Sequence, residues 1–161
     1  MKRKILGLLL LLSLFLPAIS FAVPGTMVQS TPTRYKDVNG KYNKLTMTVT
    51  CTADSGTAAF VTTGGAVLTP ATLNISGWYL ESVETNPGTI GPTNLYDITI
   101  LNSNGYDVAG ALLTNRSISN TEKVYLAGVG QPIFHDTWTI TITNNLVNSA
   151  VVVLTLTYVA E

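Results

Sequence analysis

The amino-acid sequence predicts an all-β protein that folds as a single antiparallel β-sandwich. Several segments alternate apolar and polar residues with the period of two that marks strands with one buried face. Clusters of Gly, Pro, Asn and Ser separate these segments at short intervals. No segment after residue 22 has the 3.6-residue period of an amphipathic helix. These observations together predict about seven to nine strands, and either a jelly-roll or an immunoglobulin-like strand order is compatible with them.

The first 22 residues have the composition of a secretory signal. Residues 2–4 are positively charged, residues 5–16 form an apolar run, and Ser20 and Ala22 are small residues at the positions that a signal peptidase recognises. The apolar run is shorter than the roughly 20 residues of a membrane-spanning helix. We therefore expect residues 1–22 to be a signal peptide that is cleaved near Ala22. The mature chain, with no membrane span, would then be exported to the periplasm, the cell surface or the medium.

The remaining chain has the length of one domain. Of the 161 residues, 139 follow Ala22, which is close to the usual domain size. Residues 23–34, which include Pro24 and Pro32, are expected to form an extended N-terminal arm, and residues 35–161 the β-sandwich domain. Removing Lys2, Arg3 and Lys4 leaves six basic against nine acidic residues, a net charge of −3. That sign argues against nucleic acid or an anionic membrane as a partner.

The strands are expected where the alternation is regular or β-forming residues are dense. The last strand is the clearest, because Val152, Leu154, Leu156 and Tyr158 share one face. This strand and the N-terminal arm are the two segments that could complete a neighbour's sheet. The expected strands are 44–52, 78–85, 122–127, 137–143 and 151–159.

Three hairpins are expected from turn residues. Asn104-Gly105 suits a two-residue type I′ turn, which places Ile100 opposite Ala109, and two further apolar pairs follow in the same register. Asn39-Gly40 is a second candidate turn, between Tyr35 and Tyr42. A third hairpin is expected to join the last two strands through residues 144–148.

No constellation of residues in the sequence supports catalysis or a cofactor. His135 is the only histidine, beside Asp136, and it lacks a nucleophile with motif spacing. Glu81 and Glu84 are expected on opposite faces of a strand, whereas Asp97 and Asp107 lie closer, across one hairpin. We therefore expect no enzyme, no catalytic residue and no cofactor.

Metal binding and thiol chemistry have weak support. Residues 102–107 are rich in side-chain oxygens but hold one carboxylate, which is few for calcium, and Cys/His metal spacing is missing. The single cysteine, Cys51, excludes an internal disulfide. Its place in an alternating run favours a buried apolar role, with an intermolecular disulfide or a reactive thiol as alternatives.

The surface chemistry points to binding rather than reaction. Charged residues make up 11% of the chain, against about 25% in ordinary soluble domains. Threonine-rich, charge-poor strands suit proteins that pack against neighbours. Trp78, Tyr79 and Tyr125 could stack on sugars, although core packing would explain Trp78 equally well.

The segments WYLESVETNPG, GPTNLYDITI and NGYDVAGALL follow one another between residues 78 and 113 and begin a stretch with a recognisable order of residues. Its order of turn and core residues, and its continuation to about residue 158, are similar to small structural proteins of tailed bacteriophages. The resemblance implies a shared sandwich and a role in virion structure, such as decoration or a tail or capsid accessory, with no catalytic residues. The signal peptide is a departure, because virion proteins normally assemble in the cytoplasm. The stretch comprises residues 78–88 (WYLESVETNPG), 91–100 (GPTNLYDITI), 104–113 (NGYDVAGALL), 115–117 (NRS) and 121–122 (TE).

The sequence thus favours an exported, non-catalytic structural or assembly module that acts through protein–protein contacts, including self-assembly into oligomers or a particle. Two alternatives remain open. One is a cell-surface adhesin-like or pilin-like subunit that exchanges the arm of residues 23–34. The other is a carbohydrate-binding β-sandwich module.

Overall fold

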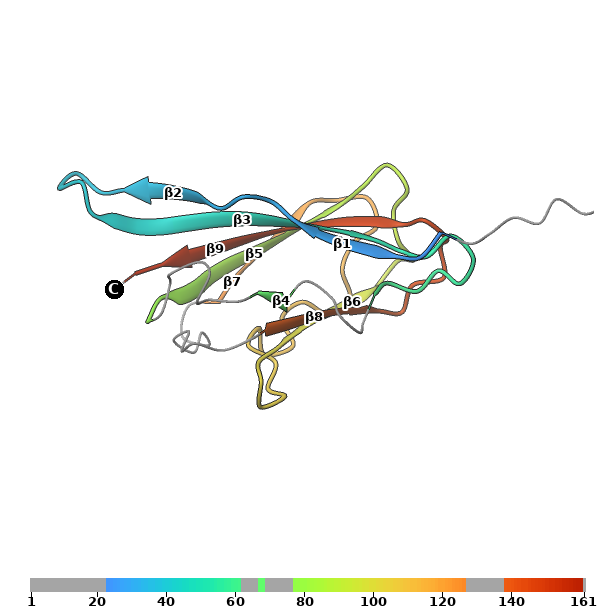
Figure 1. Ribbon diagram of the computed structural model, residues 1–161. Coiled ribbons are helices and arrows are strands. Elements are labelled where there is room, and N and C mark those ends of the chain that lie inside the picture. The colour runs from blue at the N-terminus through green and yellow to red at the C-terminus, as the bar shows by residue number, and fades with distance from the viewer. Residues whose placement is uncertain (1–22, 62–66, 69–76, 127–137, 161) are drawn as a thin grey trace, which may run out of the picture.

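The computed structural model describes residues 23–61, 67–68, 77–126 and 138–160. Within these residues, nine strands form two antiparallel sheets that pack face to face, which confirms the predicted all-β sandwich (Figure 1). The expected signal peptide and His135 lie outside the described residues. The strands are β1 (Thr26–Gln29), β2 (Thr33–Lys36), β3 (Tyr42–Thr52), β4 (Val67–Leu68), β5 (Tyr79–Pro87), β6 (Asp97–Leu101), β7 (Glu122–Tyr125), β8 (Trp138–Thr143) and β9 (Val151–Val159).

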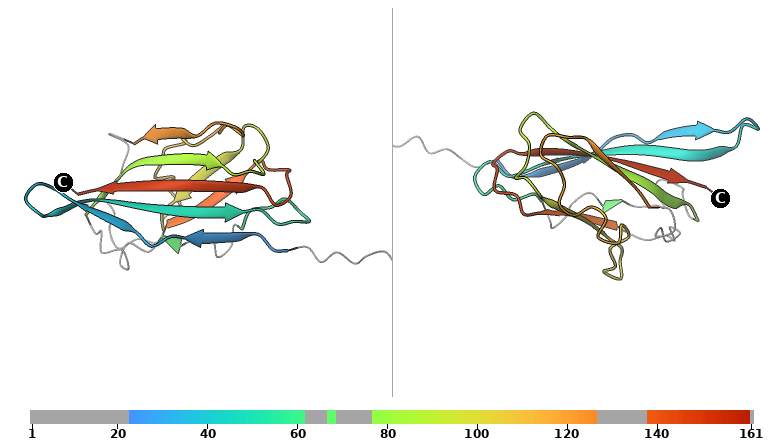
Figure 2. Two further views of the ribbon diagram at one scale, coloured as in Figure 1. Left: turned by 90° about the horizontal axis from the view of Figure 1, so that it is seen from above. Right: turned by 180° about the vertical axis from the view of Figure 1, so that it is seen from behind.

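The two sheets differ in size. The large sheet has six strands in the order β1-β3-β9-β5-β7, and β2 pairs with the other half of β3, so β1 and β2 share one edge. The small sheet has three strands in the order β4-β8-β6. Figure 2 shows the large sheet from above, with β2 and the start of β3 extending past the rest of the molecule.

The strand order is that of a jelly roll. From β3 onward, consecutive strands alternate between the sheets, and β9 returns to lie between β3 and β5. An immunoglobulin-like sandwich instead keeps several consecutive strands in the same sheet. A jelly roll has eight strands in two sheets, and the alternating part here has seven, β3 to β9.

An irregular segment takes the place of the eighth strand. Residues 107–116 run along the edge of β6 that β8 leaves open. Ile98 N–H donates to Leu113 O (3.0 Å), and Val108 N–H donates to Ile100 O (2.8 Å). These bonds satisfy the β6 edge without a continuous ladder, so the edge is covered although no regular strand forms there.

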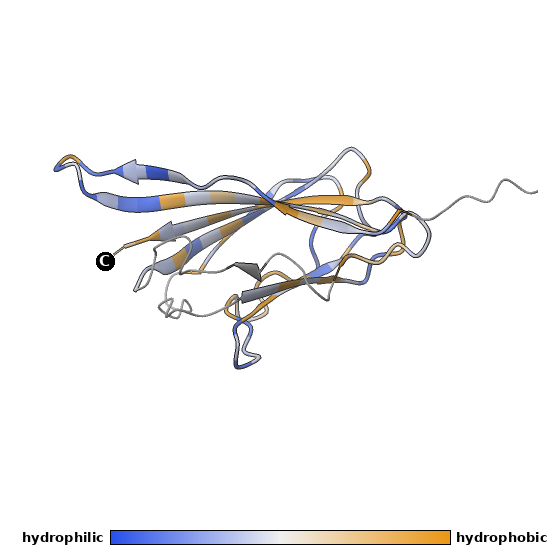
Figure 3. Ribbon diagram, in the orientation of Figure 1, coloured by the Kyte–Doolittle hydropathy of each residue, from blue (hydrophilic) through white to orange (hydrophobic). Residues whose placement is uncertain are grey.

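The core lies between the sheets, as the alternation predicts. On β3, every second residue is buried and the intervening threonines face outward, and Figure 3 shows this alternation of hydropathy along the strand. Trp138 of β8 and Tyr158 of β9 contact each other across the core, with ring centroids 6.3 Å apart. The four residues of β9 that were expected on one face are all buried there: Val152, Leu154, Leu156 and Tyr158.

The predicted register at Asn104-Gly105 is wrong by one residue. The turn is a three-residue loop, 103–105, in which only Gly105 has a positive φ (+81°). The Asn102 side chain accepts hydrogen bonds from two backbone N–H groups of this turn, at 3.0 Å each. Leu101, rather than Asn102, therefore pairs with Asp107, and the return segment is not a regular strand.

The turn at Asn39-Gly40 is confirmed as the hairpin that joins β2 to β3. It uses the same design, because Asp37 accepts from the N–H groups of Asn39 and Lys41 (2.9 Å each) and Gly40 has a φ of +78°. A three-residue loop of this kind produces a bulge beside it, and the register shifts between Tyr35 and Lys36.

The expected hairpin through residues 144–148 is wrong. β8 belongs to the small sheet and β9 to the large one, so this connection crosses between the layers. β9 is not an edge either, since it pairs with β3 on one side and with β5 on the other. It is therefore not available to complete a neighbour's sheet.

The expected N-terminal arm is partly a strand of its own sheet. Within residues 23–34, β1 pairs with β3 from Thr26↔Thr52 to Gln29↔Val49, and β2 begins at Thr33. The arm thus occupies an edge of the large sheet in the same chain.

Candidate functional site

Of the two sheets' outer faces, that of the large sheet is the broader, and part of it carries mainly β-branched residues. Register places threonines side by side across it: Thr46 lies opposite Thr157, and Thr48 lies opposite Thr155. Valines continue the same face, and Val28 is 61% exposed. The β-branched residues of this face, called the threonine face below, are Thr26, Val28, Thr33, Thr46, Thr48, Thr50, Thr52, Val151, Val153, Thr155, Val159 and Thr157, the last of which is itself buried.

Charge on this side of the sheet is balanced. Lys44 and Glu81 form an ion pair at 3.5 Å, and Lys123 lies directly opposite Glu84 on the neighbouring strand. The expectation that Glu81 and Glu84 occupy opposite faces is wrong, because a bulge at Glu81 shifts the register between Leu80 and Ser82. The extra residue turns both carboxylates to the outer face.

Tyrosines gather at one end of the same face. Tyr79 and Tyr125 lie on the outer side of neighbouring strands, and Tyr35 lies on it across the sheet. Tyr125 is 64% exposed, with the Lys123 ammonium 5.3 Å from its ring centroid. Trp78, the third residue considered for sugar stacking, is half-buried against the core, and the Arg34 guanidinium lies 6.0 Å from its ring centroid.

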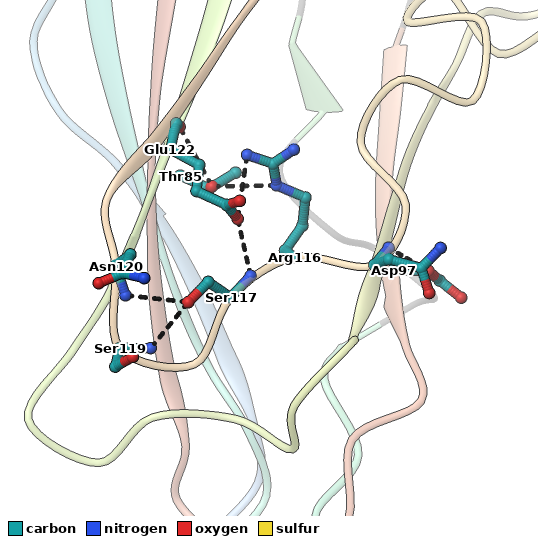
Figure 4. Close-up of polar contacts among 8 residues, drawn as sticks. Thr85, Asp97, Arg116, Ser117, Ser119, Asn120 and Glu122 are labelled. Carbon is teal, nitrogen blue, oxygen red and sulfur yellow. Dashed lines mark hydrogen bonds and ion pairs between the residues drawn. The ribbon is translucent and has the colours of Figure 1, made fainter.

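A buried polar network connects β5 of the large sheet to residues 116–122 (Figure 4). Arg116 is 6% exposed, and its guanidinium lies 3.2 Å from the Glu122 carboxylate. Its Nε also donates to the Thr85 hydroxyl of β5 (3.3 Å). Glu122 in turn accepts from the Ser117 N–H at 2.7 Å. A buried guanidinium needs such partners, because desolvating an unpaired charge is costly.

The Tyr96 hydroxyl is buried at this network. Burial raises the pKa of Tyr96, against the effect of the Thr85 hydroxyl and the Arg116 charge, which lower it. The phenol therefore stays neutral, and nothing in this environment would make it a base.

Asp97 and Asp107, the expected carboxylate candidates, bind backbone instead. Asp107 accepts from the N–H groups of Ile100, Ala109 and Ala111, at 2.8 to 3.2 Å. Asp97 accepts from Asn115 N–H (2.8 Å) and from the Asn144 side chain. Asp107 lies opposite Leu101, four residues along β6 from Asp97, so the two residues are about 13 Å apart along the strand at about 3.3 Å per residue. That is too far for a glycosidase pair.

The segments quoted above from residues 78–122 coincide with residues that hold this side of the sandwich together. Thr85, Asp107, Arg116 and Glu122 all belong to these segments, and each makes a contact described above. Sequence reasoning quoted these residues but did not foresee the network, because their pairing depends on strands that are distant in the chain.

The remaining candidates in the described residues are Cys51 and the 102–107 loop, and their contacts are with the protein's own core and backbone. Cys51 is fully buried, and burial raises the pKa of its thiol to about 12. In residues 102–107, which suggested a cation loop, the side-chain oxygens of Asn102 and Asp107 accept backbone N–H groups. In the described ranges, no three His, Cys, Asp or Glu residues lie close enough to hold a metal ion.

Comparison of the chain with protein families, with characterised proteins and with solved structures found no match. Among the described residues, no helix is long and apolar enough to cross a membrane.

Proposed function

We propose that this chain is an exported, non-catalytic structural module that assembles through protein–protein contacts, with the threonine face as its main contact surface. The observation that carries the proposal is the composition of that face. Its β-branched side chains are stiff at χ1 and lose little entropy when they are covered. Beside it, Lys44 is paired with Glu81, and Lys123 lies opposite Glu84 on the neighbouring strand. The resemblance to phage structural proteins supports the same role.

The size of the face also favours the proposal. The large sheet is five strand positions wide and its longest strands have 9 to 11 residues. At about 4.8 Å per strand and about 3.3 Å per residue, the whole outer side covers about 700 Å², of which the strands that carry the threonine face (β1, β2, β3 and β9) make up about 450 Å². A standard protein interface buries about 800 Å² per partner. The outer side of the three-stranded sheet is less than half as large, so the large sheet is the better contact surface.

The test is the mass of the mature protein by light scattering over a wide concentration range, with negative-stain imaging of the same samples. We expect defined oligomers or a larger particle. Thr50→Lys places a charge in the middle of the threonine face, between Val28 and Val153, and should dissociate the assembly because the ammonium would be desolvated in the contact.

Thr141→Lys is the matched control, since Thr141 is a half-buried, outward-facing threonine in the centre of the small sheet. It should leave the assembly intact. A monomer at every concentration, or equal dissociation by both variants, would contradict the proposal.

A second candidate function is carbohydrate binding, favoured by the position of Tyr79 and Tyr125 on one face beside the Lys44–Glu81 ion pair. Aromatic rings that stack on sugars need polar groups nearby to fix orientation. Screening a broad glycan panel tests this function. Tyr125→Ala should abolish any binding, and Tyr106→Ala, an equally exposed tyrosine on the 103–105 turn, should not.

A further inference from the structure

The first described residues are anchored to a turn on the neighbouring strand. The Val23 backbone N–H donates to the Ser55 hydroxyl oxygen at 2.6 Å, and Ser55 N–H donates back to Val23 O at 3.0 Å. Val23 thus closes a two-way hydrogen-bonded contact with residue 55, three residues before β1 begins.

Residues 23–25 pass close to the backbone of residues 52–59. A side chain on Gly25 would place its Cβ 2.9 Å from Thr52 O and 3.0 Å from Ala59 O. Only glycine allows this approach, so the path of residues 23–25 into the turn is specified by the sequence.

The receiving turn is itself held in place. The Asp54 carboxylate accepts from Gly56 N–H and Thr57 N–H at 2.7 Å each, and these bonds lower the pKa of Asp54. Asp54 N–H donates to Ala59 O (2.8 Å). The turn therefore holds Ser55, whose hydroxyl accepts from Val23, directly after Asp54 in the sequence.

We propose that the turn of residues 54–57 is a binding site for the new N-terminus that cleavage after Ala22 creates. Hydrolysis of the Ala22–Val23 peptide bond consumes one water: its oxygen becomes part of the Ala22 carboxylate, and the Val23 nitrogen becomes an ammonium. The Val23 nitrogen, which already donates to Ser55, then has three N–H donors and a positive charge. Asp54 directly precedes Ser55 in the sequence. This inference rests on the export component of the proposed function.

The docked N-terminus would hold β1 on its own sheet. β1 follows directly after Gly25, and its Met27 lies opposite Cys51 of β3. Cys51 is the only cysteine in the chain and is fully buried. Detachment of β1 would uncover the β3 edge beside this thiol, so the reaction rate of Cys51 with a thiol reagent reports how often β1 opens.

The experiment begins with the full chain exported from a bacterial host, whose intact mass should correspond to a mature protein that starts at Val23. All nine strands follow this residue. The labelling rate of Cys51 at neutral pH is then compared among purified proteins: the mature form, a form with one alanine added before Val23, Ser55→Ala and Ser55→Thr.

We expect the added alanine, which displaces the charge without changing any side chain, and Ser55→Ala to raise the labelling rate about tenfold. That is the effect of losing one charged hydrogen bond. Ser55→Thr retains the hydroxyl and should stay near the mature rate. The increase should depend only weakly on low urea concentrations, which distinguishes local opening of β1 from general loss of stability.

Equal labelling rates in all four proteins would overturn the inference, as would a mature protein that begins at another residue. A chain that is not exported would contradict the proposed function, whereas the labelling comparison on purified proteins tests the docking by itself.

Discussion

At the scale of single residues, each aspartate in the described part of the chain binds the protein's own backbone. Asp37, Asp54 and Asp107 each accept two or more backbone N–H groups at a turn. An ionised carboxylate suits this role, because its two oxygens accept several strong hydrogen bonds. The carboxylates that might have suggested chemistry are thereby used to fix turns in a fold with little regular structure between its strands.

The Arg116–Glu122 pair predicts an order of destabilisation. Glu122→Gln leaves Arg116, whose side chain is 8% exposed, without its counter-charge, and should lower the free energy of unfolding by about 3 kcal/mol. Arg116→Met leaves only Glu122, whose side chain is 35% exposed and can be hydrated, so its cost should be about 1 kcal/mol. Urea unfolding of both variants, with the exposed Lys123→Ala as a control near zero, measures the order. The reverse order would contradict this account of the network.

Cys51 predicts a loss of stability in alkaline solution. Burial raises the pKa of its thiol from 9.0 to about 12. The buried thiol's contribution to the free energy of unfolding is complete below pH 9. It is lost as the pH rises toward 12, because over this range only the unfolded chain releases the thiol proton. Unfolding free energy should fall by about 1.4 kcal/mol between pH 8 and 10. Cys51→Ala should flatten that part of the curve, measured by urea unfolding at pH 8, 9 and 10. Parallel curves for the two proteins would show that other groups cause the loss.

At the scale of elements, the two Asn-Gly turns show how one side chain sets a register. In both, an Asp or Asn two residues before the Asn-Gly pair accepts N–H groups of the turn and makes it a three-residue loop. The glycine alone then takes the positive φ. Asn-Gly by itself predicts a two-residue type I′ turn; the preceding Asx residue changes that prediction.

The irregular segment of residues 107–116, which lies along the open edge of β6, depends on Asp107. Asp107→Ala removes one hydrogen bond from β6, accepted from Ile100 N–H, and two within the 107–116 segment, accepted from Ala109 and Ala111 N–H. It should cost about 2–3 kcal/mol because the part-buried Ile100 and Ala109 N–H groups lose their partner. Asn102→Ala, in the exposed turn beside it, should cost about 1 kcal/mol. Hydrogen exchange of the Ile100 amide should quicken in Asp107→Ala and hardly change in Asn102→Ala. Equal protection in both variants would show that the carboxylate does not hold the edge.

Strand positions could be predicted from sequence because alternation is local. The last strand was expected at 151–159 and has those bounds. The layer of each strand could not be predicted, since residues 144–150 have the same turn composition whether they close a hairpin or cross between sheets. The outer-face position of both Glu81 and Glu84 also depended on a bulge that the pattern does not reveal. The threonine face followed from alternation on β3, but its extension over neighbouring strands required the pairing.

At the scale of the whole molecule, the sandwich is asymmetric. One sheet has six strands and the other three, so the large sheet has the broader outer face. β1 and β2 divide one edge of that sheet between them, which leaves its face as the larger surface for contact with another molecule. This asymmetry directs the proposed assembly to the face rather than to strand exchange.

An assembly through the threonine face should respond to salts in a particular way. Its β-branched, uncharged contact gains little from Coulomb attraction, so raising sodium chloride from about 50 to 500 mM should hardly change the association constant. Sulfate should strengthen association, because it favours burial of apolar surface. In Thr50→Lys, any residual association should instead depend on sodium chloride, since screening weakens repulsion between the added ammonium groups. Light scattering across the two salt series measures all three responses. Steep weakening of the unmodified assembly by sodium chloride would place the contact on the charged residues beside the face, Lys44, Glu81, Glu84 and Lys123, instead of on the threonines.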